Sequence, residues 1–283
     1  MTASAQRAVI SGQTRVAAVI GHPVRHSLSP RIHNAGFAAA GLDWTFVALD
    51  VAPGNGQHAV EAMRSLGIDG LSVTMPHKES AAKGADRRTP AVERLEAANC
   101  LYWHNEEIWA DSTDGDGFVA AFEQHFGQTM ADRDVAVIGA GGAARSIIEA
   151  LGRHDAGSIV VLNRSQERLR SALSLADRAR AGTAADLAEV EIIVNASPVG
   201  MTGGPAPDDL PLDIEVIGPS HTVVDIVYSP IRTPLLVAAE ERGARTQGGV
   251  AMLVHQAALA FSRWTNRPPP TNAMAAAVAD HLV

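Results

Sequence analysis

A glycine-rich turn from Gly139 to Ala144 constrains the fold of this chain more than any other feature. The apolar run from Asp134 to Ile138 has the length of a buried strand, and an alanine-rich helical pattern starts just after the glycines. The spacing is G-x-G-x-x-A, in which Ala144 is the small residue that lets helix and strand pack closely. Such a turn brings the backbone near a pyrophosphate and directs the N–H groups of the helix toward it. The sequence therefore predicts a nucleotide-binding half, with a merely tight strand-to-helix turn as the alternative.

Length, charge and cysteine content limit the class of protein. A chain of 283 residues is long enough for two domains. The formal net charge of −8, without a basic run, argues against nucleic acid or an anionic membrane as a partner. No apolar stretch is long enough to span a bilayer, and Met1 to Gln13 lacks the apolar core of a signal peptide. Because Cys100 is the one cysteine, an intramolecular disulfide is ruled out. We expect a cytoplasmic enzyme with a small-molecule substrate, and a homodimer is compatible with the sequence.

Strands and helices alternate along both halves of the chain. The first half has expected strands at residues 15–21, 44–50 and 71–75, then a hairpin with Asn105-Glu106 as its turn. The second half has expected strands at 134–138, 158–162, 191–196 and 222–227. Two further helices, 250–264 and 273–282, exceed what a nucleotide fold needs, so we expect them to pack on the first domain. The predicted class is α/β, with a substrate domain (1–113, completed by about 252–283) and a doubly wound nucleotide-binding domain (114–251).

The residues after the second strand of the nucleotide half indicate the cofactor. A protein that prefers the non-phosphorylated dinucleotide places an acidic residue there, to accept a hydrogen bond from the ribose 2′-hydroxyl. This chain has Asn163-Arg164-Ser165 instead, with Arg168 one helical turn further on. Two guanidinium groups on one rim suit a dianionic 2′-phosphate. The pattern favours NADP, and two solvated arginines at a helix start are the alternative.

Lys78 and Asp114 are the candidates for proton transfer. Lys78 follows Pro76-His77 at the end of a strand, where open α/β sheets place their ligands, and Asp114 stands at another strand-to-helix junction. A carboxylate can orient an amine while partial desolvation adjusts the pKa of that amine. A surface lysine and a helix-capping aspartate are the ordinary alternatives, and spacing alone does not pair the two residues.

Uncharged hydrogen-bonding side chains at loop and element ends would suit a ligand with several hydroxyl groups and a carboxylate. They are Ser27, Ser29, Asn34, Thr74, Asn99 and Gln256. Each also has an ordinary structural interpretation, since Ser29, for example, can cap a helix that begins at Pro30. Four nearby histidines lack both an H-x-x-x-H pair and a cysteine partner, so we predict no metal site. These histidines are His22, His26, His33 and His77.

In its motifs, the chain resembles the shikimate dehydrogenases. The similar blocks come in the order of that family and span most of the chain, and their joint order is more specific than any single block. The blocks are Gly21 to Pro30 with His33-Asn34, Ser72 to Lys78, Ala98-Asn99, Ser112 to Gly115, Gly139 to Arg145, Asn163 to Ser165, Asn195 to Met201, Asp225 to Pro230 with Thr233 to Leu236, and Gly249 to Gln256.

The resemblance implies a two-domain enzyme with a Rossmann-type NADP-binding domain, which reversibly oxidises shikimate to 3-dehydroshikimate on the route to aromatic amino acids. It implies that Lys78 and Asp114 act as a dyad at the hydroxyl being oxidised. The implied substrate-binding residues are Ser27, Ser29, Thr74, Asn99, Tyr228 and Gln256. The implied cofactor-binding residues are Gly139, Gly141, Gly142, Ala143, Asn163, Arg164, Ser165, Arg168, Ser197, Met201 and Gly249, with Met201 toward the nicotinamide.

Three positions depart from the family pattern. The family often has Asn where Ser72 and Ser112 stand, and Thr where Cys100 stands. Ser72 and Ser112 can still form hydrogen bonds, with a shorter reach than Asn. These changes leave Lys78 and Asp114 in place, but they make the identity of the substrate harder to predict. A quinate or aminoshikimate dehydrogenase is therefore one alternative. A dinucleotide or metabolite sensor without turnover and another Rossmann enzyme, such as a methyltransferase, are the others; the presence of Lys78 and Asp114 argues against the sensor.

Overall fold

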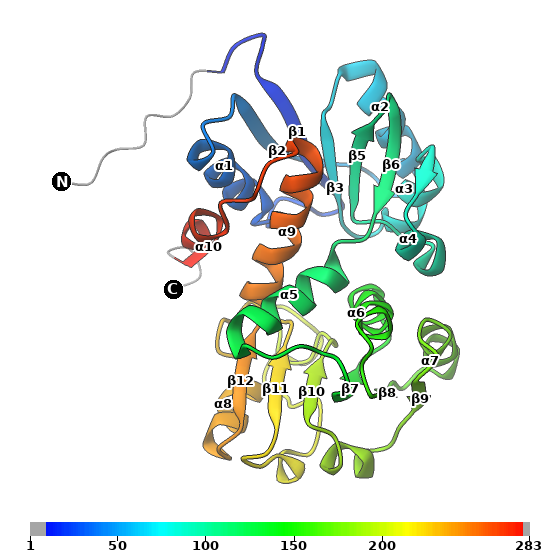
Figure 1. Cartoon of the computed structure of the whole chain (residues 1–283), viewed down its shortest axis with the longest axis vertical. Coiled ribbons are helices and arrows are strands. Elements are labelled where there is room, and N and C mark those ends of the chain that lie inside the picture. The colour runs from blue at the N-terminus through cyan, green and yellow to red at the C-terminus, as the bar shows by residue number, and fades with distance from the viewer. Residues whose placement is uncertain (1–9, 280–283) are drawn as a thin grey trace, which may run out of the picture. The chain divides into compact units, whose positions relative to one another are not determined.

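The computed structural model describes residues 10–279, which divide into two compact units (Figure 1). Of the described residues, 10–113 and 256–279 form the first unit, and Asp114 to His255 form the second. Each unit contains one six-stranded sheet. The domain ends predicted at residues 1 and 283, and the helix end predicted at Leu282, lie outside the described residues.

The first unit is built on a mixed sheet with the strand order β2-β1-β3-β5-β6-β4. Its strands are β1 (Arg15–Gly21), β2 (Trp44–Asp50), β3 (Gly70–Val73), β4 (Arg87–Arg88), β5 (Cys100–His104) and β6 (Glu107–Asp111). Its helices are α1 (Ser29–Ala39), α2 (Gly56–Leu66), α3 (Lys78–Gly84), α4 (Pro90–Leu95), α10 (Thr271–Ala279) and most of α9 (Val250–Thr265). β1 pairs in parallel with β2 and β3, whereas β5 is antiparallel to both β3 and β6.

The β5–β6 hairpin turns at the predicted dipeptide. Asn105 and Glu106 have φ values of 50° and 63°. Two consecutive residues with positive φ are what the commonest two-residue hairpin turn requires, because its twist matches that of the strands. The predicted hairpin is confirmed, and it explains why this sheet is mixed.

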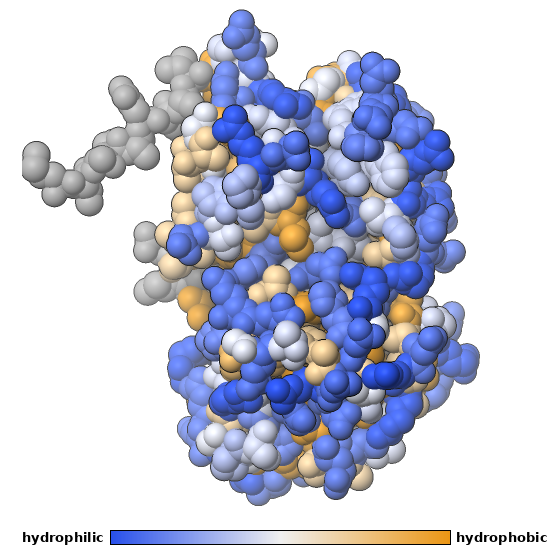
Figure 2. All heavy atoms as spheres, in the orientation of Figure 1, coloured by the Kyte–Doolittle hydropathy of each residue, from blue (hydrophilic) through white to orange (hydrophobic). Residues whose placement is uncertain are grey.

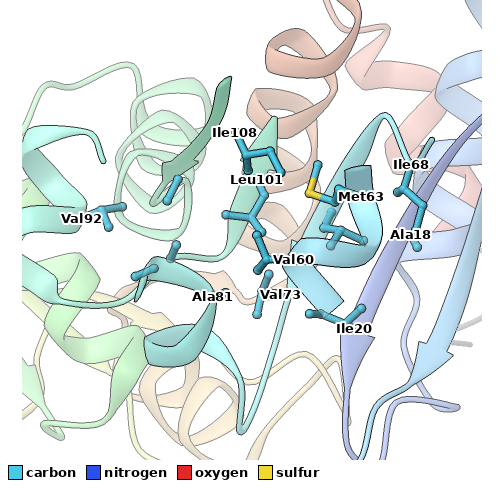
Figure 3. Close-up of a cluster of buried hydrophobic side chains, with 14 residues drawn as sticks. Ala18, Ile20, Val60, Met63, Ile68, Val73, Ala81, Val92, Leu101 and Ile108 are labelled. Carbon is cyan, nitrogen blue, oxygen red and sulfur yellow. The ribbon is translucent and has the colours of Figure 1, made fainter. Parts of the chain in front are cut away.

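Helices cover both faces of the first sheet. Because successive strand residues point to opposite faces, Ala18 and Ile20 of β1 share one face. They join a buried apolar cluster with Val60 and Met63 of α2 and Ala81 of α3 (Figure 3).

The C-terminal helices cover the other face. The indole Nε1 of Trp264 on α9 donates to the carbonyl of Leu101 on β5 (2.9 Å). Met274 on α10 lies against Gly36 of α1, where an added Cβ would be 3.1 Å from its Cγ. The prediction that these helices pack on the first domain is confirmed.

The second unit is built on an all-parallel sheet with the strand order β12-β11-β10-β7-β8-β9. Its strands are β7 (Asp134–Ile138), β8 (Ser158–Leu162), β9 (Ala179–Ala181), β10 (Ile192–Asn195), β11 (Thr222–Asp225) and β12 (Arg245–Gly248). Its helices are α5 (Asp114–Phe126), α6 (Gly142–Arg153), α7 (Gln166–Leu173) and α8 (Pro234–Glu241), with the 3₁₀ turns η1 (Ala184–Ala188) and η2 (Ile214–Val216). The chain winds outward from β7 in one direction and then from β10 in the other, which is the strand order of dinucleotide-binding folds. The predicted doubly wound domain is confirmed.

The visible surface is mainly hydrophilic, with apolar residues scattered among polar ones (Figure 2). Between residues 10 and 279, no helix combines the length and the apolar character needed to cross a membrane.

Candidate functional site

Polar residues of the first unit gather at one edge of its sheet. β1 and β3 end at this edge, and β5 begins there because it runs antiparallel to β3. Thr74 and Lys78 follow β3, Asn99 precedes β5, and Thr113 follows β6. Open α/β sheets bind ligands beyond the carboxyl ends of their parallel strands. This edge is therefore the candidate substrate site of the unit.

The loop after β1 brings Ser27 and Ser29 to this edge. Ser29 is the first residue of α1, whose N-cap position is taken by Leu28 without a side-chain hydrogen bond. The hydroxyl of Ser27 accepts a hydrogen bond from the backbone N–H of Ser29 (3.2 Å). The prediction that Ser29 caps this helix is wrong, because the Ser27 hydroxyl takes the backbone N–H at the helix start.

The same loop is tied to the end of β3. The backbone N–H of His22 donates to the carbonyl of Met75 (2.9 Å). Gly21 allows this approach, since a Cβ at that position would lie 2.4 Å from Cγ2 of Thr74. The predicted residues of the two loops are therefore held on neighbouring strand ends.

The backbone around Lys78 is fixed on both sides. Lys78 is the first residue of α3, and its carbonyl accepts from the N–H of Ala98 (3.0 Å). The preceding residue, His77, is buried with Nε2 only 2.7 Å from the carbonyl of Val51, to which it donates. Asp114 is the first residue of α5 and lies in the second unit. The pairing of Lys78 with Asp114 stays a prediction.

Asn99 and Gln256, which are far apart in sequence, lie together. The Asn99 amide nitrogen Nδ2 is 3.4 Å from Oε1 of Gln256 and 3.0 Å from Oγ1 of Thr113. The amide oxygen accepts the backbone N–H of Thr113 (2.7 Å), and this bond fixes which side of the amide is the donor. Sequence reasoning gave Thr113 no role, although it lies inside the block from Ser112 to Gly115 that was recognised.

Every predicted cofactor residue follows a strand of the second unit at its carboxyl end. After β7 come Gly139, Gly141, Gly142 and Ala143, and after β8 come Asn163, Arg164, Ser165 and Arg168. After β10 come Ser197 and Met201, and after β12 comes Gly249. Tyr228, which is predicted for the substrate, follows β11. β7 and β10 are adjacent, and the winding direction reverses between them. Doubly wound sheets bind nucleotides at this reversal point.

The glycine turn fits a pyrophosphate. Gly139 has a φ of 117°, and a Cβ there would lie 2.7 Å from the carbonyl oxygen of Ala196, so only glycine is accommodated. At Gly141 and Gly142 a Cβ would meet no atom within 4 Å, so the space beside them is open. Helix α6 begins at Gly142 without a side-chain cap, which leaves the N–H groups of its first turn to a ligand.

The turn after β8 presents two arginines. The Asn163 side chain donates to the carbonyl of Ser165 (2.9 Å), and the Ser165 hydroxyl caps α7 by accepting the N–H of Arg168 (3.4 Å). Arg164 and Arg168 are exposed. Asn163 and Ser165 thus shape the turn, and the binding of a dianion by the two exposed arginines stays a prediction.

The loop after β10 is shaped by Ser197. Its hydroxyl donates to Oδ1 of Asn195 (2.7 Å) and accepts the backbone N–H of Val199 (3.3 Å). The loop leads to Met201, whose side chain is 38% exposed although it is large and apolar. An exposed methionine on a loop after a strand suits contact with a flat ligand surface.

Tyr228 and Gly249 complete this edge of the sheet. Burial raises the pKa of Tyr228, so its hydroxyl stays protonated and able to donate a hydrogen bond. Gly249 packs on the loop after β11, where a Cβ would lie 2.1 Å from the carbonyl oxygen of Ile226. Gly249 is therefore needed for close backbone packing, whatever else it contacts. In the described part of the chain, no group of three or more His, Cys, Asp or Glu side chains could hold a metal ion.

Three family models match successive parts of the chain, and all three describe shikimate dehydrogenases. The family model for the shikimate dehydrogenase substrate binding domain matches residues 19–101. The shikimate/quinate 5-dehydrogenase model matches residues 121–207, and the shikimate 5′-dehydrogenase C-terminal domain model matches residues 249–279.

Whole-chain relatives are also found. The shikimate dehydrogenase (NADP⁺) of Geobacter metallireducens is 36% identical over 277 residues, which cover 94% of this chain and 96% of that protein. Among solved structures, a shikimate dehydrogenase in complex with NADP⁺ has a TM-score of 0.90 at 33% identity, covering 97% of this chain and 98% of its own. The shikimate 5-dehydrogenase of Thermus thermophilus in complex with NADP(H) and shikimate has a TM-score of 0.85 at 32% identity, covering 95% and 100%.

Proposed function

The chain belongs to the shikimate dehydrogenase family, and from this membership we propose that it reversibly oxidises shikimate to 3-dehydroshikimate with NADP. The observation that carries the proposal is the glycine turn of the second unit, which has open space and an uncapped helix for a pyrophosphate. The polar edge of the first unit supplies the second requirement, a place for a polyhydroxy carboxylate. We also propose that this enzyme acts in the cytoplasm, as the composition suggests.

We assign the cofactor to the second unit, residues 114–251. Gly139, Gly141 and Gly142 would cradle the pyrophosphate, and Arg164 with Arg168 would bind the 2′-phosphate, which distinguishes NADP from NAD. When bound, NADP supplies the acceptor for the hydride that leaves the substrate carbon. The protein therefore has to position the substrate and accept one proton.

We assign the substrate to residues 1–113 and the C-terminal helices. Ser27 and Ser29 would bind the carboxylate. The ring hydroxyls would contact Thr74 and the amides of Asn99 and Gln256, with the Tyr228 hydroxyl as a further donor. This role for Asn99 is supported by its contact with Gln256, since Nδ2 of Asn99 lies 3.4 Å from Oε1 of Gln256 and the two amides are therefore side by side.

Lys78 and Asp114 would handle the proton. As the hydride leaves the carbon, the hydroxyl attached to it must lose a proton, and the Lys78 amine would take it. Asp114 would orient both the amine and the hydroxyl. The fixed backbone on either side of Lys78 supports this role, because general acid–base help depends on holding the amine within hydrogen-bond reach.

Quinate is the second candidate substrate, since one of the matching family models covers shikimate and quinate enzymes together. Kinetics with shikimate, quinate and an aminoshikimate, each with NADP and with NAD, separate the candidates. We expect the highest kcat/KM with shikimate and NADP. A higher value with quinate would make quinate the substrate, and no oxidation of any of the three would contradict the proposed activity.

A further inference from the structure

We propose that Asp225, with Asn195 and Thr233, forms a positioning network. It would fix the position of two loops beside the nicotinamide, the loop after β10 and the loop after β11. The inference rests on the proposed function, which assigns Tyr228 to the substrate, and on the family resemblance, which implies that Met201 lies toward the nicotinamide. None of the three residues would touch the cofactor. They would act through the backbone that carries Ser197, Met201 and Tyr228.

The network is centred on a fully buried carboxylate. Asp225 is 0% exposed, as are Asn195 and Thr233. Its Oδ1 accepts hydrogen bonds from Nδ2 of Asn195 (3.0 Å) and from the backbone N–H of Val227 (3.0 Å). Its Oδ2 accepts the hydroxyl proton of Thr233 (2.7 Å). Both carboxylate oxygens are therefore used.

Each bond leads to a different segment at the ligand edge of the sheet. Asn195 and Asp225 are register partners at the last positions of β10 and β11. Asn195 continues into the loop that carries Ser197 and Met201, and its Oδ1 holds the Ser197 hydroxyl. Val227 immediately precedes Tyr228, and Thr233 caps α8. The carboxylate thus joins three chain segments at one point.

The two loops are also linked to each other. The backbone N–H of Thr202 donates to the carbonyl of Ser229 (2.7 Å). Displacing one loop therefore displaces the other, so the fixed point at Asp225 controls both. The glycine turn is in contact as well, because Gly139 packs on the carbonyl of Ala196, next to Asn195.

Joining three segments through a buried carboxylate costs free energy, because the charged group loses its contact with water. Burial raises the pKa of Asp225 above its usual value, and the three hydrogen bonds from Thr233, Val227 and Asn195 offset only part of that effect. Apolar packing would hold the strand ends at lower cost. What charged hydrogen bonds add is a short, directional contact that resists displacement. Such stiffness matters where the position of a reacting ring decides the rate.

Thr233→Val tests the network with little change in shape. It removes the hydroxyl that bonds Asp225, and it also removes the cap of α8. Thr233→Ser keeps both bonds and serves as the rescue variant. Thr183→Val is the control, because Thr183 is the exposed N-cap residue of a 3₁₀ turn in the same unit and its hydroxyl bonds Asp186 (3.0 Å) away from these loops. Asp225→Asn removes the charge itself.

Three measurements separate positioning from loss of fold. They are kcat and KM for shikimate oxidation, the dissociation constant of adenosine 2′,5′-bisphosphate, and the fluorescence enhancement of NADPH on binding. The bisphosphate reports the intact adenosine side of the unit, whereas NADPH fluorescence reports the surroundings of the nicotinamide.

We expect Thr233→Val and Asp225→Asn to lower kcat about ten- to a hundredfold, the range that small misplacements cost. The NADPH enhancement should fall, the bisphosphate affinity should stay within about twofold, and Thr233→Ser and Thr183→Val should match the wild type. Wild-type behaviour of Thr233→Val, or a parallel loss of bisphosphate binding, would overturn the network. A wild type that binds bisphosphate but oxidises no substrate would contradict the proposed function, and NADPH fluorescence would still test the network.

Discussion

Arg164 is exposed on the turn after β8 and Arg168 is exposed on the first turn of α7, with no acidic residue at the end of that strand. If they bind the 2′-phosphate, Arg164→Ala and Arg168→Ala each remove a charge-assisted hydrogen bond worth about 1.5–3 kcal/mol. We expect kcat/KM for NADP to fall about ten- to a hundredfold in each variant, while kcat/KM for NAD stays unchanged.

Steady-state kinetics with both cofactors provide the measurement. Arg170→Ala is the control, since Arg170 is exposed on the same helix but is not on the turn. An equal loss with NADP and NAD would show that the arginines affect the fold of the unit and not the choice of cofactor.

Lys78 offers a second test of a single residue. Lys78→Ala should lower kcat by about 10²–10⁴-fold, the usual contribution of general acid–base catalysis. NADPH affinity should be unchanged, because the cofactor is assigned to the other unit. Lys83→Ala, an exposed lysine on the same helix α3, should behave as the wild type. Near-normal turnover of Lys78→Ala would remove Lys78 from the proposed mechanism.

Candidate residues with reactive or charged groups could be named from the sequence, because they stand in recognisable motifs, and their roles stay predictions. The residues that hold them could not. Thr113 fixes Asn99 from 14 positions away, and Asp225 holds Asn195 from 30 positions away. Such partners become visible only once the strands are paired. Ser29 was given a capping role for a related reason, since sequence alone does not show which of two nearby hydroxyls takes the backbone N–H.

The glycine turn is the element on which the cofactor assignment depends, and two of its glycines should respond differently to alanine. Gly139→Ala forces a Cβ into a backbone with positive φ and against the Ala196 carbonyl, so we expect it to lose at least about 1–3 kcal/mol of unfolding free energy and cofactor affinity with it. Gly141→Ala meets no protein atom, so its loss should be at most about 1 kcal/mol, from the weaker N-cap.

The affinity for NADP then distinguishes a glycine that is needed for folding from a glycine that is needed for cofactor binding. Gly141→Ala should still weaken NADP binding about tenfold or more, because the methyl group would occupy the space into which the pyrophosphate is expected to come. Urea unfolding and NADPH titration of both variants give the comparison. Unchanged NADPH affinity in a well-folded Gly141→Ala would mean that the pyrophosphate does not approach this turn.

Among the elements, the long apolar strands and the amphipathic helices were predicted close to their observed bounds. The short strands β4, β9 and β12 were not predicted. β12 reads Arg-Thr-Gln-Gly, and β4 is a pair of arginines. All three are outer strands of their sheets, where one side of the strand is unpaired and an apolar pattern is not required. Their strand character comes from pairing with a neighbour, which no local pattern reveals.

At the scale of the molecule, the alternation of strands and helices was enough to predict two α/β units and their order. The sequence placed the unit boundary at about residue 252, whereas the second unit extends to His255 within α9, because a helix that continues across a boundary keeps its pattern. One consequence of the division is practical. All four tryptophans, Trp44, Trp103, Trp109 and Trp264, belong to the first unit, so their fluorescence follows the unfolding of that unit.

The core of the first unit contains a histidine that should make its stability depend on pH. His33 is fully buried, stacks on Phe46 with ring centroids 4.4 Å apart, and lies 4.7 Å from the ring of Trp264. Neither ring nitrogen has a hydrogen-bond partner among the described residues. Burial lowers the pKa of His33 from 6.5 to about 3. Between these values the unfolded chain binds a proton that the folded chain does not, so acid favours unfolding.

Stability from this residue is therefore fully present above pH 6.5 and is lost progressively as the pH falls toward 3. At about pH 5 the loss should be about 2 kcal/mol relative to pH 7. His33→Phe cannot bind the proton, so its unfolding free energy should decline less over the same interval, whatever the substitution costs at neutral pH. The measurement is urea unfolding followed by tryptophan fluorescence at both pH values. His58→Phe, at an exposed position on α2, controls for the loss of a histidine and should keep the wild-type slope. Equal slopes for wild type and His33→Phe would mean that the His33 imidazole is protonated in the folded core as readily as in the unfolded chain.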